Sequence, residues 1–135
     1  MLVKEIMTQN IITIDAAEPV SKASDLMRQY DIGILPVVEN GKVAGVVTDR
    51  DIVIRAISQN RNIALPVSEI MSKSTICANP KQEVSAAAKT MAAQQIRRVP
   101  VMENGELCGI LSLCDISKNG YDAEVSAALC EISKP

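Results

Sequence analysis

The feature that most constrains the fold is an internal repeat. When the sequence is shifted by 64 residues, IGILPVVENGKVAGVVTDRDI (32–52) lies over IRRVPVMENGELCGILSLCDI (96–116) without a gap, and nine of these 21 positions are identical. Ordinary composition would give about one or two matches. The same offset pairs residues 3–7 with 67–71 and 20–27 with 84–91. The sequence therefore predicts a first repeat at residues 1–61, a linker at 62–66, and a second repeat with a C-terminal helix at 67–135.

Within each copy the hydrophobic period changes in a fixed order. In the first copy, residues 11–14 favour a short strand, and residues 35–38 and 42–48 flank Asn40-Gly41, a dipeptide typical of tight hairpin turns. Residues 49–58 favour a further helix. Apolar side chains at helical spacing predict two amphipathic helices, one with Val20, Ala23, Met27 and Tyr30 and a terminal one with Val125, Leu129 and Ile132.

This order of elements predicts an α+β fold. Two pseudo-two-fold-related repeats would each form a small sheet of about three strands with flanking helices. The stripe containing Val20, Ala23 and Met27, and its counterpart with Val84, Ala87 and Met91, are expected in the core.

Charge and composition narrow the classes of partner. The net charge of −2 and pI near 5.2 lack the basic surface that supplies most nucleic-acid affinity, so nucleic acid is an unlikely partner. No apolar run approaches the roughly 20 residues that span a bilayer, and Lys4 and Glu5 lie where a signal peptide would be apolar. We therefore expect a cytoplasmic protein without a membrane segment.

The four cysteines do not form a metal-binding pattern. They lack C-x-x-C spacing, and the chain has no histidine, so no metal site is expected. Most of them are expected to be small buried hydrophobic residues, with Cys114 as a candidate reactive thiol. These cysteines are Cys77, Cys108, Cys114 and Cys130.

The motif G-h-h-[T/S]-x-x-D, where h is a hydrophobic residue, ends the hairpin of each copy. It places Thr48 and Asp51 in the first repeat, and Ser112 and Asp115 in the second, at a strand-to-helix junction. A carboxylate can accept hydrogen bonds from a ribose diol, and a hydroxyl can donate to phosphate, so the pairs suit a ribose phosphate. The same spacing is typical of a helix capping box. The pattern alone leaves these two interpretations open.

The repeat, its hairpin h-P-V-x-x-x-G and its G-h-h-[T/S]-x-x-D ending closely resemble the CBS domain, which occurs in tandem pairs called Bateman modules. The resemblance covers residue 3 to about residue 116. It implies that Thr48 and Ser112 contact phosphate and that Asp51 and Asp115 hold ribose, in the cleft between the repeats. It also implies aliphatic adenine pockets, which agrees with a chain that lacks Phe and Trp. Those pockets would be formed by Ile12, Thr13, Leu35 and Pro36 in one copy and by Ile76, Cys77, Val99 and Pro100 in the other.

The resemblance further implies basic side chains at the phosphate. Arg50, Arg97 and Arg98 occupy positions where members of the family that bind charged nucleotides often have them, although exposed surface charge is the usual role of arginine. The first repeat has Gly33 and Ile34 where the second has arginines, so the two sites are not expected to be equivalent.

The ligand implied is an adenosine-containing nucleotide. AMP, ADP or ATP is favoured, with NAD, S-adenosylmethionine or cyclic di-AMP possible, and no cofactor is required. The chain would then be a regulatory module acting on an unknown protein partner in trans.

An enzyme is disfavoured, because the sequence has no histidine, no phosphate-binding G-x-x-x-x-G-K-[S/T] loop and no nucleophile paired with a base. The main alternative is an interaction module with vestigial sites. A homodimer is expected as well, with the small residues at 86–88 as a helix-packing face.

Overall fold

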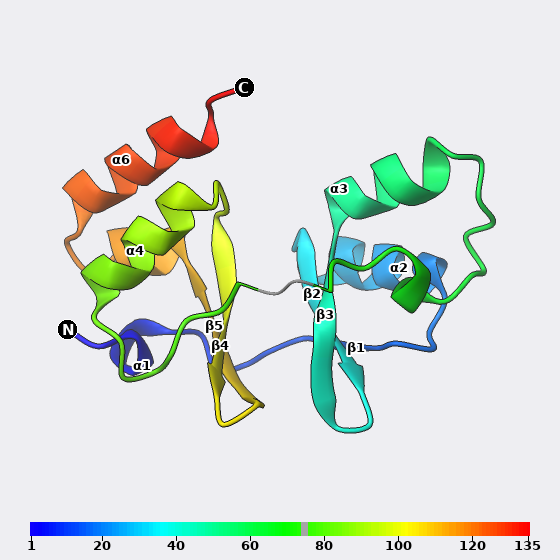
Figure 1. Cartoon of the computed structure of the whole chain (residues 1–135), viewed down its shortest axis with the longest axis horizontal. Coiled ribbons are helices and arrows are strands. Elements are labelled where there is room, and N and C mark those ends of the chain that lie inside the picture. Colours follow the sequence, from blue (N-terminus) through cyan, green and yellow to red (C-terminus); the bar gives the residue numbers. More distant parts are fainter. Residues whose placement is uncertain (74–75) are drawn as a thin grey trace. The chain divides into compact units, whose positions relative to one another are not determined.

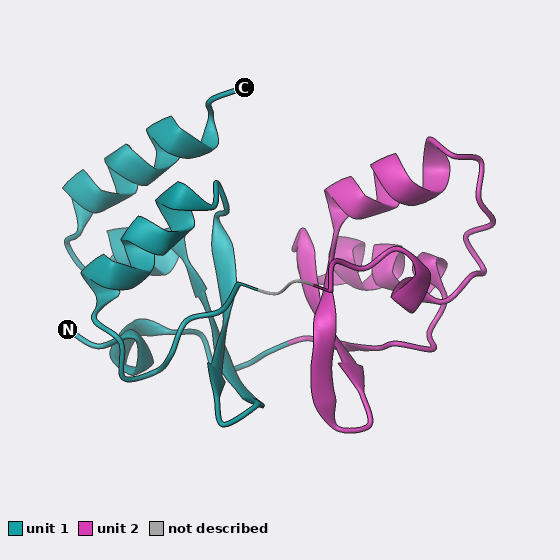
Figure 2. Ribbon diagram, in the orientation of Figure 1, with its two compact units in different colours: residues 1–11, 76–135 teal, residues 12–75 magenta. Residues whose placement is uncertain are grey.

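The computed structural model describes residues 1–73 and 76–135, in two compact units (Figures 1 and 2). Unit 2 is the continuous stretch Ile12–Thr75, whereas unit 1 combines Met1–Ile11 with Ile76–Pro135. The units therefore differ from the sequence repeats, because the first eleven residues of the first repeat fold with the second one.

Unit 2 contains a three-stranded sheet in the order β1-β2-β3. β1 (Ile14–Asp15) lies parallel to β2 (Ile34–Glu39), which pairs antiparallel with β3 (Lys42–Thr48). The hairpin turn is as predicted, because Asn40 and Gly41 both adopt positive φ, at 52° and 78°. The predicted strand at 11–14 is β-structure only from Ile14 onward.

Two helices flank this sheet. α2 (Val20–Tyr30) buries Val20, Ala23 and Met27 as predicted, whereas Tyr30 at its C-terminal end is exposed. The helix predicted at 49–58 begins as α3 (Asp49–Asp51) and continues as the π-helix η1 (Ile52–Ile57). Its wider hydrogen bonding includes the Ser58 N–H donating to the Val53 carbonyl at 2.8 Å. A short 3-10 helix, η2 (Val67–Glu69), follows.

Unit 1 is built on the hairpin of β4 (Arg98–Glu103) and β5 (Glu106–Ser112). An isolated parallel bridge from Ala78 to Val101 stands where β1 stands in unit 2. The N-terminal segment, with α1 (Val3–Ile6), joins this unit through antiparallel bridges from Leu2 to Glu83 and from Thr8 to Ile110. The other helices are α4 (Val84–Ala93), α5 (Leu113–Ser117) and α6 (Asp122–Ile132).

Each unit has its own core. The expected stripe with Val84, Ala87 and Met91 is buried in unit 1, and its counterpart is buried in unit 2. Alternate residues of β5, such as Gly109 and Leu111, are also buried, as expected for strands with one face on a core.

The terminal helix packs through Val125 and Ile132, as predicted, but not through Leu129. Leu129 is 42% exposed, while Ala128 is fully buried between Val125 and Ile132 on the packed face. Ala128 and Leu129 point about 100° apart around the helix, so only one of them can lie at the centre of the packed face, and that residue is Ala128.

The alanines at 86–88 are not a free interface. Ala87 and Ala88 are buried in unit 1, and α4 packs against α6 of the same chain. The expectation that this face joins two protomers is therefore corrected.

The expectation of buried cysteines was also wrong. Cys108 is only partly buried, and the other three free thiols are exposed. Cys77 lies outside regular structure, Cys108 on β5, and Cys114 and Cys130 on helices α5 and α6.

Candidate ligand-binding sites

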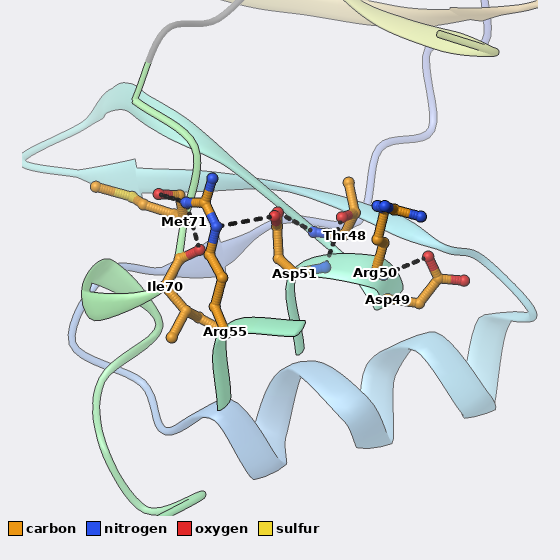
Figure 3. Close-up of polar contacts among 7 residues, drawn as sticks. All are labelled: Thr48, Asp49, Arg50, Asp51, Arg55, Ile70 and Met71. Atoms are coloured by element: carbon orange, nitrogen blue, oxygen red, sulfur yellow. Dashed lines mark hydrogen bonds and ion pairs between the residues drawn. The ribbon is translucent and has the colours of Figure 1, made fainter. Parts of the chain in front are cut away.

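In both units the motif forms a reciprocal helix cap. The Asp51 N–H donates to Thr48 Oγ1 at 3.0 Å, and the Thr48 N–H donates to Asp51 Oδ2 at 3.0 Å (Figure 3). In unit 1 the Asp115 N–H donates to Ser112 Oγ at 3.1 Å, and the Ser112 N–H donates to Asp115 Oδ2 at 3.0 Å. The capping interpretation therefore describes both pairs.

Capping does not use all the polar capacity of these side chains. It occupies Oδ2 of each aspartate and an acceptor site of each hydroxyl, and it leaves Oδ1 and the hydroxyl proton. Those are the groups that a ribose hydroxyl and a phosphate oxygen would need. The groups around Oδ1 therefore determine how well each aspartate can accept a ribose hydroxyl.

In unit 2 a guanidinium lies beside Asp51. Arg55 Nε is 3.7 Å from Asp51 Oδ1, and Arg55 Nη1 donates to the carbonyls of Ile70 and Met71, each at 3.4 Å (Figure 3). The Asp51 side chain is 14% exposed and that of Arg55 is 48% exposed. The cation is thus held on one side by the carboxylate and on the other by two main-chain carbonyls.

In unit 1 a hydroxyl replaces that cation. Thr8 Oγ1 lies 3.4 Å from both oxygens of Asp115. Asn119, the counterpart of Arg55, turns its amide back to donate to the main-chain carbonyl of Asp115 at 2.8 Å. Among the described residues, the ion pairs include Asp51 but not Asp115.

Unit 1 instead has arginines on its strand side. The register of β4 and β5 places Arg98 directly opposite Ser112, so the two side chains share one face of the hairpin. The carbonyl of Arg97 accepts the Leu113 N–H at 3.0 Å, which fixes Arg97 beside the start of α5. Both arginines are exposed, as is Arg50 in unit 2.

Four of the eight predicted adenine residues lie on strands β2 and β4. Pro36 and Pro100 lie on the same strand faces as the motif hydroxyls, and both are buried. Leu35 and Val99 are 0% and 2% exposed within the two cores, so their side chains do not face a ligand surface within their own units.

The remaining four lie on the segments leading into the strands. The parallel register of Ile14 with Val37 puts Ile12 level with Leu35, and the bridge of Ala78 to Val101 puts Ile76 level with Val99. Ile12 and Ile76 are partly buried, and their neighbours Thr13 and Cys77 are exposed. Each unit therefore brings its own predicted residues to one sheet.

Comparison with known proteins identifies the family. The model of the CBS domain matches residues 3–58 and 67–121. The CBS domain-containing protein YhcV of Bacillus subtilis is 39% identical over 132 residues, covering 97% of this chain and 94% of that protein. The chain belongs to the CBS-domain family.

Two solved CBS structures resemble this chain. The CBS domain pair of protein MJ0100, in complex with 5'-methylthioadenosine and S-adenosyl-L-methionine, has a TM-score of 0.79 and 30% identity, covering 88% of this chain and 94% of that one. A hexameric CBS-CP12 protein from bloom-forming cyanobacteria has a TM-score of 0.76 and 34% identity, covering 87% of this chain and 66% of that one.

The predictions from sequence missed two residues next to the CBS motifs. Thr8 lies 107 positions before Asp115 and reaches it only because the N-terminal segment folds with the second CBS repeat. Arg55 lies four residues after Asp51, a spacing that places two side chains on one helix face, so a local signal was available.

The described residues 1–73 and 76–135 contain neither a membrane-spanning helix nor a cluster of metal ligands. None of the helices there is both long enough and apolar enough to cross a membrane. Within the same residues, no group of three or more metal-ligating side chains comes together.

Proposed function

We propose that this CBS pair is a non-enzymatic regulatory module that binds an adenosine-containing nucleotide and modulates a protein partner in trans. The observation that carries the proposal is the pairing of Arg98 with Ser112 beside Asp115. A cation, a hydroxyl donor and a carboxylate acceptor then lie together at one end of the β4-β5 hairpin.

Each of these groups has a role in the proposed site. Oδ1 of Asp115 accepts a ribose hydroxyl, displacing the long contact from Thr8. The Ser112 hydroxyl accepts the capping bond and donates its proton to a phosphate oxygen. Arg97 and Arg98 pair with the phosphate. The adenine packs against the segment 76–77, and the buried Val99 and Pro100 support that surface from below.

The relatives support the class of ligand. The CBS pair of MJ0100 is described with two adenosyl ligands, which favours adenosine as the shared recognition element. The arginines of unit 1 favour a ligand with a terminal phosphate, which AMP, ADP and ATP carry. NAD has only an internal diphosphate, cyclic di-AMP only phosphodiesters, and S-adenosylmethionine no phosphate, so these three come after them.

The test is a thermal-shift panel of these six ligands at ~1 mM. A ligand of ~10 μM affinity adds about 2.7 kcal/mol of stability. Asp115→Ala should abolish the shift. Ser112→Ala removes a capping bond and the proposed phosphate donor, so it should lower the unliganded stability by about 1 kcal/mol and reduce the ligand shift without abolishing it, because the ribose contact stays in place.

If none of the six ligands shifts the wild-type protein, the proposal fails. If Asp115→Ala and wild type shift equally, the motif is a cap alone. The absence of any shift would favour the alternative, an interaction module whose ligand sites are vestigial, whereas equal shifts would mean that the ligand binds without Asp115.

We also propose that the chain forms a homodimer through η1. Val53, Ile54 and Ile57 are 52%, 48% and 57% exposed on this one helix, and contiguous exposed apolar side chains mark interaction surfaces. Sedimentation should show a dimer for wild type and a monomer for Ile54→Lys; a wild-type monomer at working concentration would contradict this interface.

The proposed location is the cytoplasm. Three exposed free thiols suit a reducing compartment, in which they are not driven to form disulfides. The net charge of −2 disfavours nucleic acid as a partner, because a nucleic-acid-binding surface is basic.

A further inference from the structure

The two CBS repeats differ at each charged position around the motif. The 64-residue offset pairs Arg55 with Asn119, Asp49 with Leu113, and Gly33 with Arg97. The motif itself is kept as a cap in both units. The charges that a ligand would meet are therefore arranged differently at Asp51 and at Asp115.

The carboxylate of Asp51 is already engaged on both oxygens. Oδ2 accepts the Thr48 N–H at 3.0 Å, and Oδ1 faces Arg55 Nε at 3.7 Å. Arg55 is also held by two carbonyls, so displacing it from Asp51 sacrifices an ion pair in a three-point arrangement. At Asp115 the corresponding contact is a hydroxyl at 3.4 Å, which can rotate away or donate to another acceptor.

A second negative charge faces the phosphate side in unit 2. A Cβ placed on Gly33 would lie 2.9 Å from Asp49 Oδ2, so this carboxylate lies directly against the position where unit 1 has Arg97. Asp49 Oδ1 accepts the Arg50 N–H at 2.8 Å, which holds the carboxylate there. An anionic group approaching the end of β3 meets the carboxylate of Asp49 beside the cation of Arg50. At the end of β5 it meets two arginines, with Leu113 in place of Asp49.

We propose that Arg55 and Asp49 are specificity-determining residues that suppress the first site, so that one nucleotide binds per chain, at Asp115. Arg55 opposes capture of the ribose diol by Asp51, and Asp49 repels the phosphate. The inference rests on the proposed nucleotide-binding function and assigns it to one of the two CBS motifs.

The experiment is isothermal titration calorimetry with two probes, AMP and adenosine, on four full-length proteins. These are wild type, Arg55→Asn, Asp49→Asn/Arg55→Asn, and Asn119→Arg. Arg55→Asn installs the side chain of the other repeat. Arg55 also borders an open polar hollow of about 680 Å³, so shortening its side chain does not create a cavity in the core.

The two probes separate the two residues. Wild type should bind one AMP. Arg55→Asn should gain a second, weaker event with adenosine, because the ribose acceptor is released. The double variant should gain a second event with AMP as well. Asn119→Arg should weaken AMP binding about threefold, because a cation next to Asp115 then competes for its carboxylate.

Two results would overturn this inference while leaving the proposed function intact. One is two equal AMP sites in wild type. The other is a double variant that still binds one AMP, with AMP binding abolished by Asp115→Ala. If none of the proteins binds AMP or adenosine, the proposed function fails and this inference fails with it. Circular dichroism and urea midpoints equal to those of wild type confirm that the variants are folded.

Discussion

The two units present the same capped aspartate in opposite surroundings. In unit 2 the carboxylate is paired with Arg55, from its own helix, whereas in unit 1 the arginines lie at the start of β4 and the side-chain neighbour of the carboxylate is the hydroxyl of Thr8. The hydrogen bonds of the cap are nearly identical in length. A duplicated motif can thus keep its structural role in both copies while its neighbours diverge.

The equivalent helices α2 and α4 also differ in the residues that they present to a neighbouring helix. α4 has Ala88 and Ala92 on the side that meets α6, whereas α2 has Ser24 and Arg28 at the corresponding positions. Small apolar residues let a helix approach closely, and the exposed polar residues of α2 do not favour such a neighbour. The terminal helix is therefore matched to unit 1 only.

The largest expected effect comes from α6. Ala128→Asp buries a charge at a fully buried position, so we expect a loss of about 3 kcal/mol or more in the free energy of unfolding, measured by urea denaturation. Leu129→Asp is the matched control, because Leu129 is 42% exposed and should lose about 0.5 kcal/mol or less. Equal losses would contradict the packed face described for α6.

The second largest effect on the free energy of unfolding is expected at the glycines of the two motifs. A Cβ on Gly45 would collide with the main-chain carbonyl of Ser72, whereas on Gly109 it would meet Met7 Sδ and the Thr8 carbonyl, each at 2.8 Å. Gly45→Ala should cost about 3 kcal/mol and Gly109→Ala about 1 to 2 kcal/mol, because the Cβ on Gly45 would approach a main-chain carbonyl more closely than the Cβ on Gly109, and a thioether such as that of Met7 yields readily. Unfolding midpoints in urea measure both, and a larger loss for Gly109→Ala would reverse this comparison.

The smallest effect concerns stability without ligand. Arg55→Asn removes an ion pair whose cation is 48% exposed, so we expect a change of about 0.5 kcal/mol or less in the free energy of unfolding. Asn119→Arg should change it as little. A loss above about 2 kcal/mol for Arg55→Asn would mean that its bonds to Ile70 and Met71 anchor the fold, rather than tune the site.

Local patterns predicted much of this fold. The repeat, the Asn40-Gly41 turn, α2 and the position of the motif at a strand-to-helix junction all follow from turn chemistry and hydrophobic period. The capping interpretation was also available from the spacing of Thr48 and Asp51 alone.

The sequence predictions were wrong or incomplete where packing between distant segments determines which side chain is buried or which residue is in contact. Nothing near Ala128 distinguishes it from the larger Leu129, because the choice depends on the shape of α4. Exposed cysteines also have no local signature. The partner of Asp115 is supplied by residue 8, and only the assignment of the N-terminal segment to unit 1 makes that contact possible.

That assignment has a consequence for how the chain is made. Unit 2 is a continuous stretch that can fold while the ribosome is still adding residues, whereas unit 1 must wait for its second half to emerge before residues 1–11 find their place. Closing unit 1 then joins the two ends of the chain around an already formed insert, which shortens the effective loop and reduces the entropy lost on closure. The segment 1–11 therefore reaches its native contacts only after residues 76–135 have been made.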